Sequence, residues 1–176
     1  ADRGVIRALV FDFDGVILDT EGPIFRAWNE EFEAHGCPPL TVEEWSAEIG
    51  AVRGLDLLAI LRERTSVEVD GDAIAARRQA RRDQLLVDES LLDGVEAWLE
   101  QAEAAGFAVA IASSSEIGWV EAHLLRLGLR HRFAHLACYR PGGRGKPAPD
   151  LYVAACAALG VDPAEALAIE DSPNGI

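Results

Sequence analysis

The stretch that decides the fold is VFDFDGVILDT, residues 10–20, in which an apolar run ends in two aspartates and then turns on a glycine. Residues 5–11 have the apolar content of a short buried strand, so Asp12 and Asp14 come directly after its carboxyl end. Two carboxylates held close together repel each other, and a strand that ends in this way needs a chemical reason.

Composition limits the partners that the chain can bind. Its 176 residues with 49% hydrophobic content suit one compact domain or a core with a modest insertion. A net charge of −14 would repel a nucleic-acid backbone or an anionic membrane, so we expect neither as a partner. No apolar run approaches the ~18 residues that span a bilayer, and the N-terminus lacks a signal-peptide pattern, so we expect a cytoplasmic protein.

Two residue types are distributed in an informative way. The three cysteines, Cys37, Cys138 and Cys156, are widely spaced and odd in number, which favours reduced packing residues over disulfides or a zinc site. Of the sixteen basic residues, fifteen are arginines and only Lys146 is a lysine. A general preference for arginine explains the fifteen, but the single lysine calls for a chemical cause.

Apolar periodicity divides the chain into a strand, a helical block and an alternating region. Residues 24–35 have helical spacing, and all signals from there to about Leu92 are helical, which predicts a small bundle. After Asp93-Gly94 we expect a helix to Ala105, a strand at 108–112, a helix at 116–127, a strand near Leu136, a helix at 149–159 and a strand at 166–169.

This order predicts an α/β fold with a Rossmann-like parallel sheet and an all-helical domain inserted after the first strand. We expect a discontinuous core of residues 1–20 and 93–176 and a helical domain of residues 21–92. In such a sheet the ligand lies beyond the carboxyl ends of the strands, where the strand order reverses.

Polar side chains gather at that same edge. The expected strands end in Asp12 and Asp14, in the serines at 113–115, and in Glu170 and Asp171, while Lys146 lies in GKPAPD at 145–150. Each group alone is usually a turn, a loop or a helix cap. Their occurrence together, in this order and at strand ends, favours an active site.

The chemistry of these groups is consistent. Several carboxylates at one edge repel one another unless a hard cation lies among them, and Mg²⁺ uses one or two carboxylates together with waters and a phosphate. A lysine and a serine hydroxyl can hold the transferring oxygens, and the turn at Gly15 can present backbone N–H groups to them. The residues therefore predict a magnesium ion and a phosphoryl group.

Four motifs resemble those of the haloacid dehalogenase-like superfamily, in the branch close to beta-phosphoglucomutase and sugar-phosphate phosphatases. They are DFDGV at 12–16, IASSS at 111–115, GKPAPD at 145–150 and EDSPNG at 170–175. The resemblance covers nearly the whole chain. It implies a helical cap at 21–92 that closes over the site and reads the substrate, and it implies a further helix and strand after Ile176, so the core is expected to be truncated there.

The resemblance also implies a role for each residue. Asp12 would be the nucleophile that forms an aspartyl-phosphate, and Asp14 would protonate the leaving oxygen and then activate water. Mg²⁺ would be held by the Asp12 side chain, the Asp14 carbonyl and Asp171, with Glu170 supporting its waters. The phosphoryl group and substrate would be held by Ser113, Lys146, Gly15, Ser114 and the cap residue Arg53.

The arginine pairs Arg77-Arg78 and Arg81-Arg82 are interpreted as an exposed helix face. Arg53 lies where related mutases grip a second phosphate, although a solvated helix charge explains it equally well.

The expected function is a magnesium-dependent phosphatase, acting as a monomer on a small phosphorylated metabolite. The second aspartate favours phosphoryl transfer over dehalogenation, and the absence of a lysine in 21–92 excludes the family's phosphonate chemistry. Beta-phosphoglucomutase is an alternative, weakened because Ile24 replaces the mutase histidine and Glu116-Ile117 replaces Lys-Asn. A catalytically inactive binding protein of the same family is a second alternative.

Overall fold

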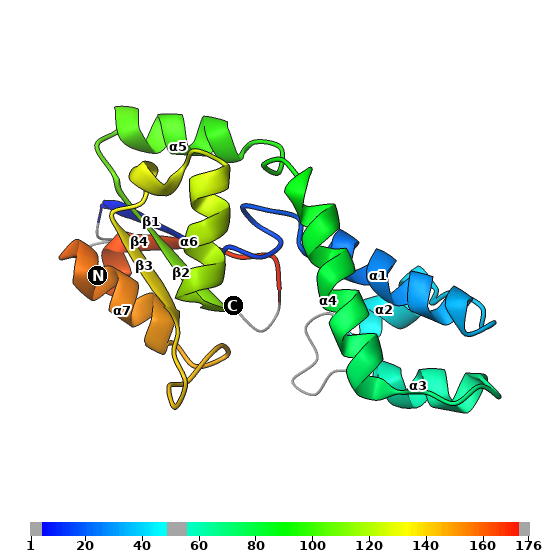
Figure 1. Ribbon diagram of the computed structural model, residues 1–176. Helices are drawn as coiled ribbons and strands as arrows, with labels where there is room; N and C mark the ends of the chain where they lie inside the picture. Colours follow the sequence, from blue (N-terminus) through cyan, green and yellow to red (C-terminus); the bar gives the residue numbers. More distant parts are fainter. Residues whose placement is uncertain (1–4, 49–55, 173–176) are drawn as a thin grey trace. The chain divides into compact units, whose positions relative to one another are not determined.

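The computed structural model describes residues 5–48 and 56–172 (Figure 1). The chain forms two compact units. The first, here called the α/β unit, combines Ala1–Asp19 with Ser90–Ile176, and the second, the helical unit, is Thr20–Glu89. None of the helices in these described ranges is long and apolar enough to cross a membrane.

The α/β unit is built on a parallel sheet of four strands in the order β3-β2-β1-β4. The strands are β1 (Ala8–Phe11), β2 (Ala108–Glu116), β3 (His135–Tyr139) and β4 (Ala166–Ile169). Phe11 lies opposite Ile111 on one side and Ile169 on the other, so these three strands reach their carboxyl ends at one edge. The predicted parallel sheet is confirmed.

Three helices connect the strands: α5 (Val95–Ala104), α6 (Ile117–Arg126) and α7 (Asp150–Leu159) (Figure 1). The strand order moves from β1 to β2 to β3 and then reverses to β4. Because parallel crossovers are right-handed, the reversal places α7 on the opposite face from α5 and α6. The residues that α7 covers are small, namely Val10, Ala110, Ala112 and Ala137, which lets the helix approach the sheet closely.

The second strand is longer than the predicted span of 108–112. Its apolar run ends at Ala112, but backbone pairing with β3 continues to Glu116, with an irregular register between Ser113 and Glu116. The three serines therefore belong to the strand rather than to a loop after it. An irregular strand end of this kind can aim polar side chains out of the sheet toward a site.

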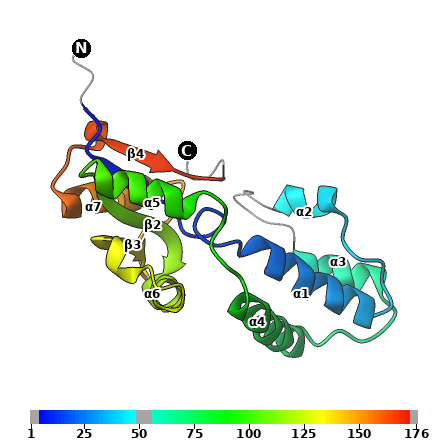
Figure 2. The ribbon, with the colours of Figure 1, turned by 90° about the horizontal axis from the view of Figure 1, so that it is seen from above.

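The helical unit contains α1 (Glu21–Ala34), α2 (Val42–Glu48), α3 (Leu57–Arg64) and α4 (Gly71–Val87). Asp56 and Asp70 begin α3 and α4, where their carboxylates accept backbone N–H groups of the first turn. The core of the unit is aromatic and aliphatic and includes Trp28, Phe32 and Leu61. α4 runs beside α1 (Figure 2).

Ion pairs join α4 to α1 and change the interpretation of the arginine pairs. Arg77 donates from two nitrogens to Glu31, at 2.9 and 2.8 Å, and Arg81 donates to Glu30 at 2.7 and 2.9 Å. Glu31 is only 7% exposed. Arg77 and Arg81 keep the predicted exposure, with 54% and 41% of their side chains accessible, but each also pairs with an acidic residue of α1, 46 and 51 positions earlier.

The three cysteines are free and buried. Burial, together with the nearby charges of Asp14 and Asp12, raises the pKa of the Cys138 thiol to about 11. This thiol is consequently protonated at neutral pH, which fits a packing residue rather than a reactive one.

The buried Glu31 carboxylate gives a test of the helical unit. Glu31→Gln keeps the shape but removes the charge that Arg77 pairs with, so we expect the free energy of unfolding to fall by about 1–3 kcal/mol. Glu30→Gln is the matched control, because both partners of its ion pair are 41% exposed, and it should change stability by less than about 1 kcal/mol. Urea denaturation followed by circular dichroism measures both; equal losses would contradict a special role for the buried pair.

Candidate active site

The candidate site lies at the carboxyl edge of the sheet in the α/β unit. Asp12 follows β1, and its N–H donates to the carbonyl of Ile169 at 2.9 Å, so the pairing of β1 with β4 continues into the site. Glu170 and Asp171 follow β4 directly. The sheet therefore brings together residues about 158 positions apart in the sequence.

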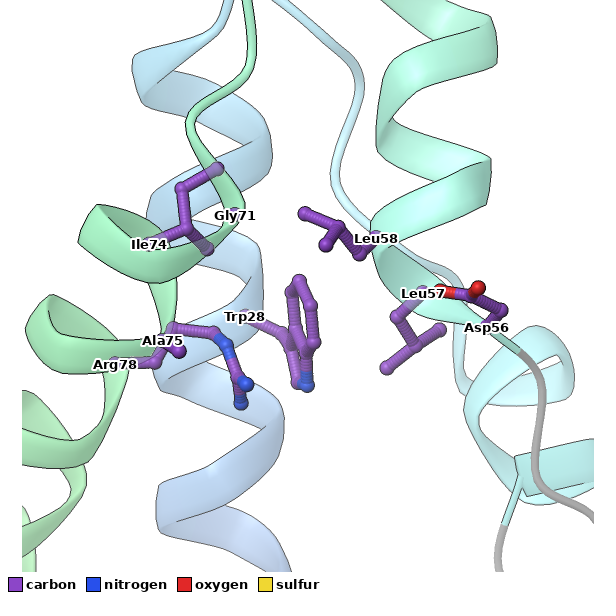
Figure 3. Close-up of a pocket in the computed structure, with 8 residues that line it drawn as sticks. All are labelled: Trp28, Asp56, Leu57, Leu58, Gly71, Ile74, Ala75 and Arg78. Atoms are coloured by element: carbon purple, nitrogen blue, oxygen red, sulfur yellow. The ribbon is translucent and has the colours of Figure 1, made fainter.

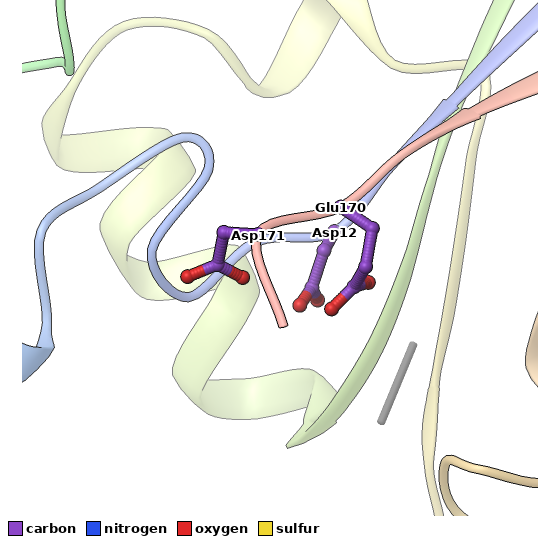
Figure 4. A group of neighbouring side chains, drawn as sticks. All are labelled: Asp12, Glu170 and Asp171. Atoms are coloured by element: carbon purple, nitrogen blue, oxygen red, sulfur yellow. The ribbon is translucent and has the colours of Figure 1, made fainter. Parts of the chain in front are cut away.

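The carboxylates of Asp12, Glu170 and Asp171 form one cluster (Figure 4). One oxygen of each lies within 4.8 Å of the others, and Asp12 is 8% exposed. Three carboxylates in so small a space form a donor set suited to a hard cation such as Mg²⁺.

Lys146 provides a positive charge to this cluster. Its Nζ lies 2.9 Å from Asp12 Oδ1 and 2.6 Å from Glu170 Oε2, and its side chain is 6% exposed. The backbone N–H of Lys146 donates to Ser114 Oγ at 3.2 Å, and its ammonium lies 5.0 Å from the centre of the Tyr152 ring. The only lysine of the chain is thus held in the acidic cluster from several sides.

The three carboxyl groups titrate differently because their partners differ. Burial raises the pKa of Asp12 to about 7, although Lys146 and the backbone N–H of Phe13 oppose the shift. Burial acts on Glu170 in the same direction, but hydrogen bonds from Lys146, Tyr152 and Ser172 outweigh it and lower its pKa. Burial also raises the pKa of Asp171, and the charge of Glu170 adds to that effect. Lys146 therefore compensates only part of the negative charge in the cluster.

Gly15 makes the turn after Asp14 possible. Its φ of +76° is a backbone conformation that residues with a side chain rarely adopt. A Cβ at this position would lie 2.0 Å from Asp171 Oδ2, which is an impossible contact. The turn and the last acidic residue thus fit together only because residue 15 is glycine.

Asp14 is held apart from the acidic cluster by donors on β2 and α6. Ser115 Oγ donates to Asp14 Oδ2 at 2.6 Å, and Trp119 Nε1 donates to Asp14 Oδ1 at 3.2 Å. Ser113 Oγ lies at 3.5 Å, at the limit of a hydrogen bond, and is 1% exposed. Sequence reasoning missed Ser115 and Trp119 as partners of Asp14.

The predicted residues therefore form two adjoining groups. Asp12, Glu170, Asp171 and Lys146 make up the cluster, whereas Asp14 accepts hydrogen bonds from Ser115 at the end of β2 and from Trp119 of α6. The role assigned to the Asp14 carbonyl stays a prediction. Arg53 lies outside the described residues.

Comparison with known proteins gives a family match over almost the entire chain. The family model for haloacid dehalogenase-like hydrolases matches residues 6–176. YhcW of Bacillus subtilis is 39% identical, with 97% of this chain and 77% of that protein covered. Fructose-1-phosphate phosphatase YqaB of Escherichia coli is 30% identical, with coverage of 96% and 88%, and beta-phosphoglucomutase of B. subtilis is 30% identical, with coverage of 97% and 77%.

A solved structure agrees with these relatives. The crystal structure of a HAD family hydrolase from Deinococcus radiodurans R1, with bound phosphate and sodium, matches with a TM-score of 0.79 and 31% identity. The match covers 97% of this chain and 74% of that chain. The resemblance drawn from the four motifs and the predicted fold class are confirmed.

Gly15 provides a test of the site's construction. Gly15→Ala introduces both backbone strain and an overlap with Asp171, so we expect it to lower the free energy of unfolding by about 1–3 kcal/mol. Gly118→Ala is the matched control, because its Cβ would meet nothing within 4 Å and it lies in α6, where alanine should stabilise by about 0.5 kcal/mol. Chemical denaturation of both variants checks the opposite signs; stabilisation by Gly15→Ala would refute the close fit.

Proposed function

Because the chain belongs to the haloacid dehalogenase-like hydrolase family, we propose that it is a magnesium-dependent phosphatase. Its substrate would be a small phosphorylated metabolite of the sugar-phosphate class, hydrolysed through an aspartyl-phosphate. The observation that carries the proposal is the cluster of Asp12, Glu170 and Asp171 around the only lysine of the chain. The names of two relatives, a fructose-1-phosphate phosphatase and a beta-phosphoglucomutase, support the substrate class.

The residues present fit a magnesium ion. Three carboxylates share the cluster with one ammonium group, so the cluster can accept a cation. Asp12, the backbone carbonyl of Asp14 and Asp171 would hold the ion, with Glu170 hydrogen-bonded to its waters. When bound, the ion would supply positive charge to the phosphoryl oxygens of the substrate.

In the first proposed step, a carboxylate oxygen of Asp12 attacks phosphorus and the bond to the leaving oxygen breaks. Lys146, 2.9 Å from Asp12 in this structure, and the hydroxyl of Ser113 would hold the phosphoryl oxygens. The predicted donation from the Gly15 turn to the phosphoryl group does not hold, because the N–H of Gly15 donates to the carbonyl of Leu18 at 2.9 Å. The exposed Ser114, whose Oγ accepts the backbone N–H of Lys146, would add a contact to the substrate. The product of this step is an aspartyl-phosphate on Asp12.

Asp14 would manage the protons in both steps. As an acid it would give its proton to the leaving oxygen, and as a base it would take one from the water that attacks the aspartyl-phosphate. Hydrolysis then releases phosphate and restores the Asp12 carboxylate. The donors Ser115 and Trp119 support this role, because they hold both oxygens of Asp14 in one orientation.

Beta-phosphoglucomutase remains the alternative activity, in line with a 30% identical relative of that name. The residues favour the phosphatase, because Ile24 and Glu116-Ile117 lack the groups that would hold a second phosphate. Arg53 is proposed as a contact of such a phosphate. An inactive binding protein is disfavoured, because the residues proposed as nucleophile and as acid/base, Asp12 and Asp14, are both present with Lys146.

Phosphate release tests the reaction and its nucleophile together. With Mg²⁺ and a panel of sugar phosphates that includes beta-glucose 1-phosphate, we expect phosphate release that stops in excess chelator. Asp12→Asn should lose at least about three orders of magnitude in kcat, since it removes the attacking oxygen. Conversion of beta-glucose 1-phosphate to the 6-phosphate would instead identify a mutase, and no turnover from the folded chain would leave the binding-protein alternative.

Trp119 tests how Asp14 is oriented. Trp119→Phe keeps an aromatic ring but removes the N–H that donates to Asp14, so we expect kcat to fall about tenfold with KM nearly unchanged. Trp98→Phe is the matched control, because Trp98 lies on α5 and is 50% exposed. Steady-state kinetics of both variants at equal thermal stability check the result; an unchanged kcat in Trp119→Phe would remove this residue from the mechanism.

A further inference from the structure

The helical unit contains a hollow of about 380 Å³, within the size range of small-molecule sites (Figure 3). Trp28 of α1 lies between side chains of α4, among them Ile74 and Arg78, and side chains of α3, among them Leu57 and Leu58 (Figure 3). A second hollow, of about 280 Å³, shares Arg78 and Ala75 with the first. Arg78 is thus the cation common to both.

Arg78 differs from the other arginines of α4. Those three pair with carboxylates: Arg77 with Glu31, Arg81 with Glu30 and Arg82 with Asp83. Among the residues that the structure describes, no carboxylate pairs with Arg78. Its guanidinium carbon lies instead 3.7 Å from the centre of the Trp28 ring.

The guanidinium of Arg78 is incompletely satisfied. Its Nε atom is buried and has no hydrogen-bond partner within the described part of the chain. Stacking on Trp28 engages the face of the guanidinium, whereas the Nε–H lies in its plane and lacks an acceptor. A half-buried cation with an unpaired donor is unfavourable, and an anion in the hollow would supply negative charge and acceptors to the guanidinium.

The charges around Arg78 agree with this view. Burial, the largest influence, lowers the pKa of Arg78; the negative charge of Glu31 opposes that shift and the positive charge of Arg82 adds to it. Both oxygens of Glu31 accept hydrogen bonds from Arg77, and Glu31 forms no ion pair with Arg78 within the described part of the chain. The positive charge in the hollow is therefore available to a ligand.

The side of the hollow formed by the start of α3 indicates which other chemical groups the ligand would have. Asp56 lines the hollow from the start of α3, where its Oδ1 accepts the N–H of Ala59 at 3.0 Å. A carboxylate oxygen accepts hydrogen bonds from hydroxyl groups but repels a second anionic group. Leu57, Ile74 and the Trp28 ring provide apolar surface for a carbon framework. The hollow thus suits a molecule with one anionic group and several hydroxyls.

We propose that the helical unit binds a hydroxylated organic anion, with the anionic group on Arg78 and hydroxyl groups directed toward Asp56. The anionic group can be the carboxylate of a sugar acid or the phosphate of a sugar phosphate, since both accept two parallel hydrogen bonds from a guanidinium. This binding does not depend on the phosphatase reaction proposed above, and it can be measured without turnover.

The test uses the full chain in excess chelator and follows the indole N–H resonance of Trp28, assigned with Trp28→Phe, by NMR. The probes are gluconate, glucose 6-phosphate and the uncharged polyol sorbitol. We expect a saturable shift with gluconate, glucose 6-phosphate or both, and none with sorbitol. A shift with gluconate shows that the hollow binds a carboxylate, and a shift with glucose 6-phosphate shows that it binds a phosphate.

Substitutions of Arg78 and Arg81 test whether the anion binds to Arg78. Arg78→Gln should weaken it at least about tenfold, because charge-assisted hydrogen bonds are lost. Arg81→Gln is the matched control: it removes the same charge from the same helix but lines neither hollow, so affinity should not change. If Arg78→Gln reduces the folded fraction, Arg78→Lys keeps the charge and should still weaken binding about threefold or more, because it loses the planar fork.

Three results would overturn the proposal: no shift of the Trp28 resonance with either anion, equal affinity in Arg78→Gln and Arg81→Gln, or a sorbitol response equal to that of gluconate. Each would make Arg78 only a structural partner of Trp28. Because no step of the assay involves hydrolysis, failure here leaves the proposed phosphatase untouched, and an inactive enzyme leaves this result valid.

Discussion

Mutual repulsion among carboxylates is the constraint on which the active edge of this molecule depends. Asp12, Glu170 and Asp171 are brought together by the pairing of β1 with β4, and the sheet cannot form in this register without crowding them. Lys146 relieves part of the repulsion through short contacts to two of them. The strand pairing and the single lysine set the charges of this edge, and the glycine at residue 15 leaves the space that Asp171 occupies.

Most helices and strands could be predicted from apolar periodicity, because that periodicity reflects which side chains of a segment are buried. The strand at 166–169 appears at its predicted bounds, and the helices around it differ by one or a few residues. The second strand was predicted too short, because the apolar run stops at Ala112 while backbone pairing with β3 carries on through polar residues. Apolar periodicity cannot detect the polar residues at the end of β2, because only backbone pairing with β3 shows that they belong to the strand.

The residues of the candidate site were also only partly predictable from the sequence. Asp12, Glu170 and Asp171 could be predicted from their places after strands, since parallel strands bring their carboxyl ends to one edge. Trp119 could not, because its contact with Asp14 depends on how α6 is rotated after the irregular end of β2. The distinct environment of Arg78 could not be predicted either. The sequence shows four arginines in two pairs, and it does not indicate which of them pair with acidic residues of α1, as Arg77 does with Glu31, 46 positions earlier.

The position of the only lysine has a consequence for the chemistry that can be performed on the chain. Within these 176 residues, the side-chain primary amine exists solely beside Asp12 and Glu170, with 6% of its side chain exposed. Acylation, reductive methylation or amine-directed cross-linking of a lysine in this sequence is therefore always a modification of the site. The fifteen arginines give the surface its positive charge without offering such reagents any other ε-amino group.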